Sequence, residues 1–245
     1  MLLPDGVFRE NVIFDGSDLD GFGRVDARAV LRRFQAIAGH HFDALHQGMS
    51  VAEAHGCFWA TARTALDISA PPPAGEALIL DTWPGRQAHG IFLRHYVLTG
   101  EDGAVLLRGL SAWVLMDIES RSLSADRDWV SHPGGISRPG ELDARQRFKM
   151  PADLPFAAFR TVQAAETDGN GHMNNAEYCR WGDDLLPDAF AAAHRLRRLW
   201  IEYKKEMTQG QTAELRWALE DGSLFLRSAV EGRDTFLMRC DYDPI

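Results

Sequence analysis

The feature that most constrains the fold of this chain is a repeat within its own sequence. The stretch DGFGRVDARAV at 20–30 can be laid over DGNGHMNNAEY at 168–178 without a gap. An aspartate and two glycines then recur at the same spacing: Asp20, Gly21 and Gly23 in the first copy, and Asp168, Gly169 and Gly171 in the second. Each copy lies between an expected strand and an expected helix. The repeat therefore predicts a duplicated domain.

The pattern around the first copy predicts a strand, a helix and four more strands. Asp26 is the expected N-cap of the helix, whose apolar residues recur at spacings of three and four and which should end before Gly48. The strands are expected at 7–14, 57–69, 76–85, 90–100 and 104–120. Because the connections between the last four are short, we expect antiparallel pairing.

The same order of elements follows the second copy. A helix is expected to start at 176 and to be interrupted at Gly182 and Pro187. Strands are expected at 156–165, 198–207, 212–220, 223–231 and 234–242, and the turns between the last three, at 221–222 and 231–233, suit hairpins. Residues 125–153 are rich in Pro, Gly and charge, which is typical of a connector. We therefore predict domains at 1–124 and 154–245, joined by a linker at 125–153.

Composition excludes several classes of function. A net charge of −9 opposes general nucleic-acid binding. No apolar run approaches the roughly 20 residues that span a bilayer, and no basic segment with a cleavage site begins the chain, so we expect a cytoplasmic protein that does not bind membranes. Three cysteines far apart, Cys57, Cys179 and Cys240, argue against a disulfide framework and a zinc site. His40, His41 and His46 lack a carboxylate at ligand spacing, so we expect no metal and no cofactor.

The differences between the two copies indicate where chemistry takes place. Asn170, His172 and Asn174 stand where the first copy has Phe22, Arg24 and Asp26. An Asp, an Asn and a His before a helix place a base, an amide and an imidazole near N–H groups that lack intrahelical partners. That set suits acyl transfer to water. The alternative is purely structural: Asp168 and Asn170 shape turns, Asn174 or Asn175 caps the helix, and His172 fills space.

The second copy also resembles a known family. DGNGHMNNAEY is similar to the Asp-x-Asn-x-His-x-Asn-Asn-x-x-Tyr signature of the acyl-ACP thioesterases. Other segments of that family are similar to three further stretches of this chain: DTWPG at 81–85, SAWVLMDIESRS at 111–122 and IEYKKEM at 201–207. The resemblance implies an α+β fold of two tandem hot-dog domains, each a long helix wrapped by an antiparallel sheet. It also implies a substrate channel in the first domain and catalysis in the second. By position, it implies the catalytic set Asp168, Asn170, His172 and Glu206.

One departure from the family pattern limits the mechanism. Where the plant enzymes carry a Cys beside the catalytic Glu, this chain has Met207, which excludes a thiol nucleophile there. Cys179 falls inside the expected helix, which favours a packed core thiol. Strict alternation along the expected strand places Glu206 with Glu202 and Lys204, so a bulge or the seam between domains is needed to bring it to the site.

The roles in hydrolysis follow from the chemistry of a thioester, whose thiol leaves easily because its pKa is about 8.5. We expect Asn170 and the N–H groups of Met173 and Asn174, near the helix N-terminus, to stabilise the oxyanion. A carboxylate, Glu206 or Asp168, would act as base or nucleophile. His172 would orient water or protonate the leaving sulfur.

The resemblance implies a fatty acyl group on acyl carrier protein as substrate. The carrier is acidic, and the basic cluster of Arg195, Arg197 and Arg198 is the candidate docking site, although a solvated strand face is an equal alternative. The rival functions are an acyl-CoA thioesterase and a non-catalytic acyl-binding protein. A hydratase on this fold is disfavoured, because His172 follows Asp168 by four positions rather than five and no Pro follows Asn170. A homodimer and the acyl chain length are left open.

Overall fold

The computed structural model describes residues 1–126, 128–130, 141–143 and 147–245. The chain divides into two compact units: unit 1 comprises Met1–Ala62 and Ser69–Ala144, and unit 2 comprises Arg63–Ile68 and Arg145–Ile245. The predicted linker at 125–153 lies partly outside the described residues, and its boundaries stay a prediction. Among the described residues, no helix combines the length and the hydropathy needed to cross a bilayer.

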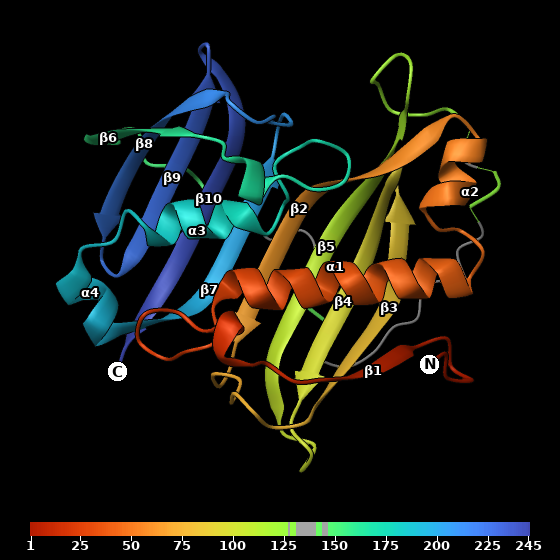
Figure 1. The fold of residues 1–245 in the computed structure, drawn as a ribbon, viewed down its shortest axis with the longest axis horizontal. Helices are drawn as coiled ribbons and strands as arrows, with labels where there is room; N and C mark the ends of the chain where they lie inside the picture. Colours follow the sequence, from red (N-terminus) through yellow and green to blue (C-terminus); the bar gives the residue numbers. More distant parts are fainter. Residues whose placement is uncertain (127, 131–140, 144–146) are drawn as a thin grey trace. The chain divides into compact units, whose positions relative to one another are not determined.

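Unit 1 is an antiparallel sheet with one long helix across it (Figure 1). Its elements are β1 (Phe8–Val12), η1 (Gly16–Asp18), α1 (Ala27–Ala44), α2 (Met49–Ala54), β2 (Cys57–Ile68), β3 (Leu78–Ala88), β4 (Ile91–Thr99) and β5 (Val105–Asp117). The strand order is β1-β3-β4-β5-β2. The predicted helix and strands are confirmed, whereas the short helix α2 was not predicted.

Local chemistry explains why α1 forms where it does. The Asp26 carboxylate accepts a hydrogen bond from the backbone N–H of Ala29 at 2.5 Å, as predicted for an N-cap. Phe34, on the buried face, stacks on Tyr96 of β4 with ring centroids 4.0 Å apart. A Cβ at Gly109 of β5 would lie only 2.1 Å from the Phe34 ring, so a glycine is required beneath the helix.

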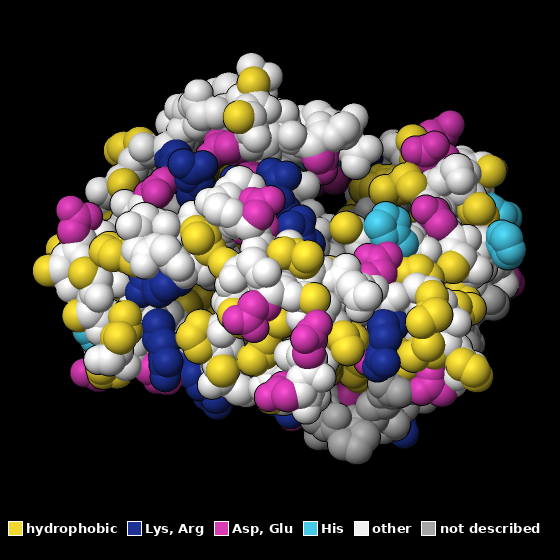
Figure 2. Space-filling view, turned by 60° about the horizontal axis from the view of Figure 1, so that its bottom comes forward, with side chains coloured by type: hydrophobic (Ala, Val, Ile, Leu, Met, Phe, Trp, Pro, Cys, Tyr) yellow, Lys and Arg dark blue, Asp and Glu magenta, His cyan; other side chains and the backbone are white. Residues whose placement is uncertain are grey.

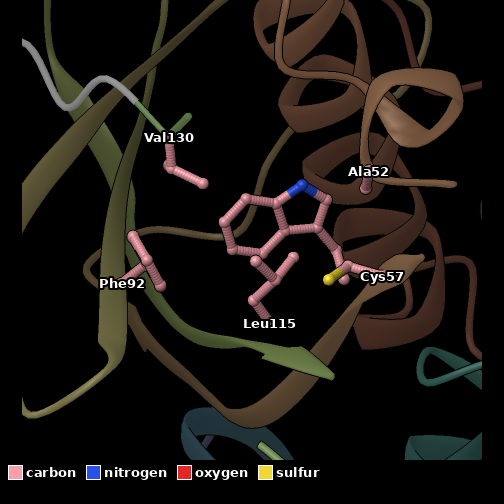
Figure 3. Close-up of a cluster of buried hydrophobic side chains, with 6 residues drawn as sticks. Ala52, Cys57, Phe92, Leu115 and Val130 are labelled. Atoms are coloured by element: carbon pink, nitrogen blue, oxygen red, sulfur yellow. The ribbon is translucent and has the colours of Figure 1, made fainter. Parts of the chain in front are cut away.

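An aromatic cluster fills the core of unit 1 near the end of α1. Trp59 of β2 packs there with Ala52, Cys57, Phe92, Leu115 and Val130 (Figure 3). Phe42 of α1 is partly buried against the cluster and stacks on Trp59 at a centroid distance of 5.1 Å. Large aromatic rings of this cluster therefore fill the space between the end of α1 and the sheet.

Unit 2 repeats the plan with a shorter helix. Its elements, besides the last residues of β2, are β6 (Phe156–Thr161), η2 (Ala164–Glu166), α3 (Glu177–Asp183), α4 (Asp188–Ala193), β7 (His194–Tyr203), β8 (Thr212–Glu220), β9 (Ser223–Val230) and β10 (Arg233–Pro244). The strand order is β2-β7-β10-β9-β8-β6. The predicted interruption is confirmed: α3 ends just after Gly182, and Pro187 is the N-cap of α4.

Two tight turns fix the last three strands. Asp221 and Gly222 have φ values of 47° and 75°, and Glu231 and Gly232 have 51° and 75°. Positive φ at both central residues is the geometry of a two-residue hairpin turn. These hairpins agree with the prediction. The expected strand at 198–207 is wrong at both ends, because β7 begins at His194 and ends at Tyr203.

Candidate active site

The two copies of the repeated turn share the same backbone hydrogen bonds. The N–H of Asp20 donates to the carbonyl of Arg24 at 2.7 Å, and the N–H of Asp168 donates to that of His172 at 2.8 Å. Gly23 and Gly171 both have φ of 76° and donate to the carbonyl of the aspartate, at 3.1 and 3.0 Å. The repeat seen in the sequence is therefore a repeat of conformation.

The side chains of the two turns have different partners. In the first copy, the Nε of Arg24 donates to Oδ2 of Asp20 at 2.8 Å, so the turn neutralises its own carboxylate. In the second copy, the Nε2 of His172 lies 3.5 Å from Oε2 of Glu206. The exposed fractions of these two side chains are 28% and 40%, so water reaches both. An imidazole beside a carboxylate can transfer a proton to or from a bound water.

Glu206 reaches His172 because the chain leaves the sheet after Tyr203. The N–H groups of Lys204 and Lys205 both donate to the carbonyl of Thr235, at 2.8 and 3.1 Å. The following residues then pair with the turn itself, since Thr208 forms a bridge with His172. The alternation argument for Glu206 does not apply, because the residue follows the strand rather than lying within it.

Asp168 holds the turn through its side chain. Its Oδ1 accepts hydrogen bonds from the backbone N–H groups of Asn170 at 2.9 Å and His172 at 3.4 Å. The carboxylate therefore fixes the backbone that carries the amide and the imidazole. Asn170 lies exposed at the tip of this turn.

Met173 and Asn174 lie just before helix α3, but their backbone N–H groups already have acceptors. Helix α3 begins at Glu177, so both residues precede it. The N–H of Met173 donates to the carbonyl of Met207 at 2.7 Å, and the N–H of Asn174 donates to that of Glu166 at 2.8 Å. An oxyanion would have to displace these carbonyls. The Oδ1 of Asn174 accepts from the N–H of Ala176 at 2.9 Å, which is a turn-forming role.

Two further residues support the site. Burial, followed by the nearby charges of Glu206 and Asp168, raises the pKa of Tyr178 well above its usual value, so this phenol keeps its proton. Tyr178 could have been found from the last position of the signature. Sequence reasoning missed Glu166, a buried carboxylate that accepts hydrogen bonds from the indole N–H of Trp181 at 2.9 Å and the backbone N–H of Gln163 at 2.8 Å. The one sequence signal was that Glu166 aligns with Asp18 when the two copies of the repeat are superposed, so that both copies have an acidic residue just before the turn.

The other predicted residues lie in defined places. On β7, Arg195 is exposed, whereas Arg197 and Arg198 form ion pairs with Asp67, the latter at 3.0 Å. Cys179 is buried in α3, and the three cysteines, all among the described residues, form no disulfide. Within the described part of the chain, no group of three or more His, Cys, Asp or Glu side chains is arranged to hold a metal ion.

Comparison with known proteins gives consistent matches. The family model of the acyl-ACP thioesterase N-terminal domain matches residues 5–130, and that of the C-terminal domain matches residues 156–235. An oleoyl-acyl carrier protein thioesterase from Arabidopsis thaliana is 24% identical, over 64% of this chain and 46% of the relative. A dodecanoyl-[acyl-carrier-protein] hydrolase from Umbellularia californica is 23% identical, over 67% of this chain and 45% of the relative. The chain spans about half the length of the curated relatives it matches.

Solved structures show the same hot-dog fold. An acyl-ACP thioesterase from Bacteroides thetaiotaomicron superposes with a TM-score of 0.86 at 18% identity, covering 97% of this chain and 98% of that one. A 12:0-ACP thioesterase from Umbellularia californica superposes with a TM-score of 0.82 at 19% identity, covering 98% of both chains. The two family models together match most of the sequence. The chain therefore belongs to the acyl-ACP thioesterase family.

Proposed function

We propose that this protein hydrolyses the thioester of a fatty acyl group carried on acyl carrier protein and releases the free fatty acid. The observation that carries the proposal is the pairing of His172 with Glu206 at 3.5 Å on the second turn, where the first turn has a self-neutralised Asp20–Arg24 pair. Family membership supplies the reaction class. A cytoplasmic location stays a prediction; the names of the plant relatives describe them as chloroplastic.

The mechanism assigns one task to each residue. Glu206 takes a proton from a water molecule oriented by His172, and the water oxygen bonds to the acyl carbon. The amide of Asn170 donates to the oxyanion that forms on the carbonyl, a contribution of about 3 to 4 kcal/mol to the barrier. The carbon–sulfur bond then breaks, His172 donates its Nε2 proton to the leaving sulfur, and Glu206 returns the proton taken from water to His172. Asp168 acts as a positioning residue, because its carboxylate already accepts two backbone N–H groups.

The duplicated units divide the work in this proposal. The second copy, within 154–245, is catalytic, since its turn carries the His172–Glu206 pair where the turn of the first copy has the Asp20–Arg24 ion pair. The first copy, within 1–124, is non-catalytic and holds the acyl chain. Its helix α1 has 18 residues, whereas α3 has 7. The apolar interface between helix and sheet is therefore longer in unit 1, which suits an extended acyl chain.

A hydrolysis assay across acyl-ACPs and acyl-CoAs of increasing length tests the function. We expect free fatty acid and free thiol in equal amounts, with a higher kcat/KM on acyl-ACP. Glu206→Gln and His172→Ala should each lower kcat by about 100-fold or more. Glu220→Gln, an exposed glutamate at the end of β8, is the matched control and should keep wild-type activity. Near-wild-type turnover in both site variants would refute the assignment, and faster hydrolysis of acyl-CoA would identify the other carrier.

We infer that the acidic carrier docks on the basic cluster of β7. In Figure 2, basic side chains stand in small groups among acidic ones, so an acidic partner needs a local site. Arg195 is exposed, and the ion pairs of Arg197 and Arg198 with Asp67 compensate part of their charge. Arg195 is therefore the residue on which docking should depend most. A homodimer stays a prediction.

A further inference from the structure

Unit 1 contains a buried positive charge for which the described residues provide no counter-ion. Arg94, on β4, is 2% exposed and lies under the helix α1. No carboxylate forms an ion pair with it among the described residues. The sequence of the remaining residues, 127, 131–140 and 144–146, contains no Asp or Glu. Burial lowers the pKa of Arg94 to about 10, which still leaves the guanidinium charged at neutral pH.

The partners that Arg94 does have are neutral. Its Nη1 lies 2.9 Å from Nδ1 of His41 on α1 and 3.3 Å from Oγ1 of Thr82 on β3. A guanidinium only donates hydrogen bonds, so Nδ1 of His41 must accept and the imidazole proton lies on Nε2. His41 is completely buried. The pair is therefore a fixed donor assembly with one full positive charge.

Two donors of this assembly have no acceptor. Among the described residues, neither Nε of Arg94 nor Nε2 of His41 has a hydrogen-bond partner, although both atoms are buried. A buried unpaired donor costs about 1 to 3 kcal/mol, and a buried charge without a counter-ion costs several. Such groups are retained in native proteins when a ligand or another role compensates for them.

We propose that unit 1 binds an organic carboxylate with an apolar tail, whose oxygens accept hydrogen bonds from Arg94 and His41. The surroundings favour a tail over a bare anion. The ring of Phe8 stacks on His41 at 5.3 Å, and the ring of Phe42 covers the guanidinium at 4.4 Å. Phe42 is only partly buried and joins the aromatic cluster around Trp59, so an apolar lining adjoins the guanidinium on the side of this ring.

Octanoate is the probe, with octan-1-ol as the uncharged ligand of equal length. The protein, as the 245-residue chain, is titrated by calorimetry, and its unfolding is followed with and without each ligand. We expect octanoate to bind and stabilise the wild type more than octan-1-ol does. Arg94→Met should weaken octanoate binding by about tenfold or more, since it removes a charge-assisted hydrogen bond. Arg108→Met, which changes a half-buried arginine of β5 in the same unit, is the matched control and should bind as the wild type does.

The stability of the ligand-free variants separates this proposal from a purely structural role. Replacing an uncompensated buried charge by an apolar side chain should leave the unfolding midpoint of Arg94→Met equal to that of the wild type or above it. A lower midpoint together with unchanged octanoate binding would show a structural role and overturn the proposal. If Arg94→Met does not fold, His41→Phe keeps the ring stacking and removes the Nε2 donor, and it should weaken binding in the same sense.

Octanoate binding at the unit 1 site can be tested separately from the hydrolytic activity. Octanoate is also a product of the proposed reaction, so the titration is repeated with Glu206→Gln. Dependence on Arg94 that persists in this background supports the unit 1 site even if no thioester is hydrolysed. Equal binding of octanoate and octan-1-ol by the wild type, or competition by chloride or phosphate at similar concentration, would overturn it.

Discussion

Asp20 and Asp168 have the same structural role in the two copies of the turn, but only Asp168 also has a proposed role in catalysis. Asp20 and Asp168 each accept two backbone hydrogen bonds through Oδ1. We expect Asp20→Ala and Asp168→Ala to lower the free energy of unfolding by a similar amount, about 1 to 2 kcal/mol. Only Asp168→Ala should also lower kcat, because it loosens the backbone that carries Asn170 and His172. Urea unfolding and steady-state hydrolysis of both variants measure the two effects. Equal activity in both variants would contradict the assigned role.

His41 predicts a pH dependence of stability. Burial, followed by the charge of Arg94, lowers the pKa of His41 to about 3, below the value of about 6.5 expected in the unfolded chain. The unfolded chain therefore takes up a proton between these values while the folded protein does not. The resulting stability is fully present above pH 6.5 and is lost as the pH falls toward 3, by at most about 1.4 kcal/mol per unit.

The measurement is the free energy of unfolding in urea at pH 7, 6, 5 and 4 for the wild type and His41→Phe. The carboxylates contribute equally to both proteins, so the difference between the two slopes isolates His41. We expect the wild type to lose stability more steeply on acidification. Parallel slopes would show that His41 titrates normally in the folded protein.

At the scale of elements, a short 3-10 helix precedes each copy of the repeated turn, η1 in the first copy and η2 in the second, and supports that turn. In η2, the buried side chain of Glu166 bonds Trp181 and Gln163, and its carbonyl accepts from Asn174. Glu166→Ala should destabilise the protein by about 2 to 4 kcal/mol, since the indole N–H of Trp181 loses its partner inside the core. In this variant kcat should fall more than KM rises. Asp18→Ala in η1 is the matched control, and thermal unfolding with steady-state kinetics checks both; a loss of kcat in Asp18→Ala as large as in Glu166→Ala would argue against the role.

The elements also show what the sequence could predict. Helix α1, the antiparallel strands and the hairpins at Asp221 and Glu231 follow from local periodicity and turn residues, and they were predicted. The place of Glu206 could not be predicted in this way. Its position depends on Lys204 and Lys205 sharing the carbonyl of Thr235, a contact distant in sequence. The same limit applies to Met173 and Asn174, whose N–H groups are taken by carbonyls that no local pattern identifies.

At the scale of the whole molecule, the net charge of −9 should make the proposed docking of an acidic carrier depend on single arginines. Arg195→Glu should raise KM for acyl-ACP several-fold and leave KM for a small acyl thioester unchanged, because only the carrier contacts the surface. The effect should weaken at high salt. Arg198→Glu should act on both stability and docking, since it also breaks the ion pair with Asp67. Equal effects of Arg195→Glu on both substrates would contradict the docking site.

Because β2 contributes to both units, the choice of fragment boundaries affects whether unit 2 keeps all of its strands. Arg63–Ile68 belongs with unit 2 and pairs with β7, although it lies far upstream of the rest of that unit. A fragment that starts at the second repeat therefore leaves one edge of β7 with unpaired backbone groups, ready to template association with another chain. The second unit is therefore not a continuous stretch of sequence, because one of its strands comes from the segment that also forms part of unit 1.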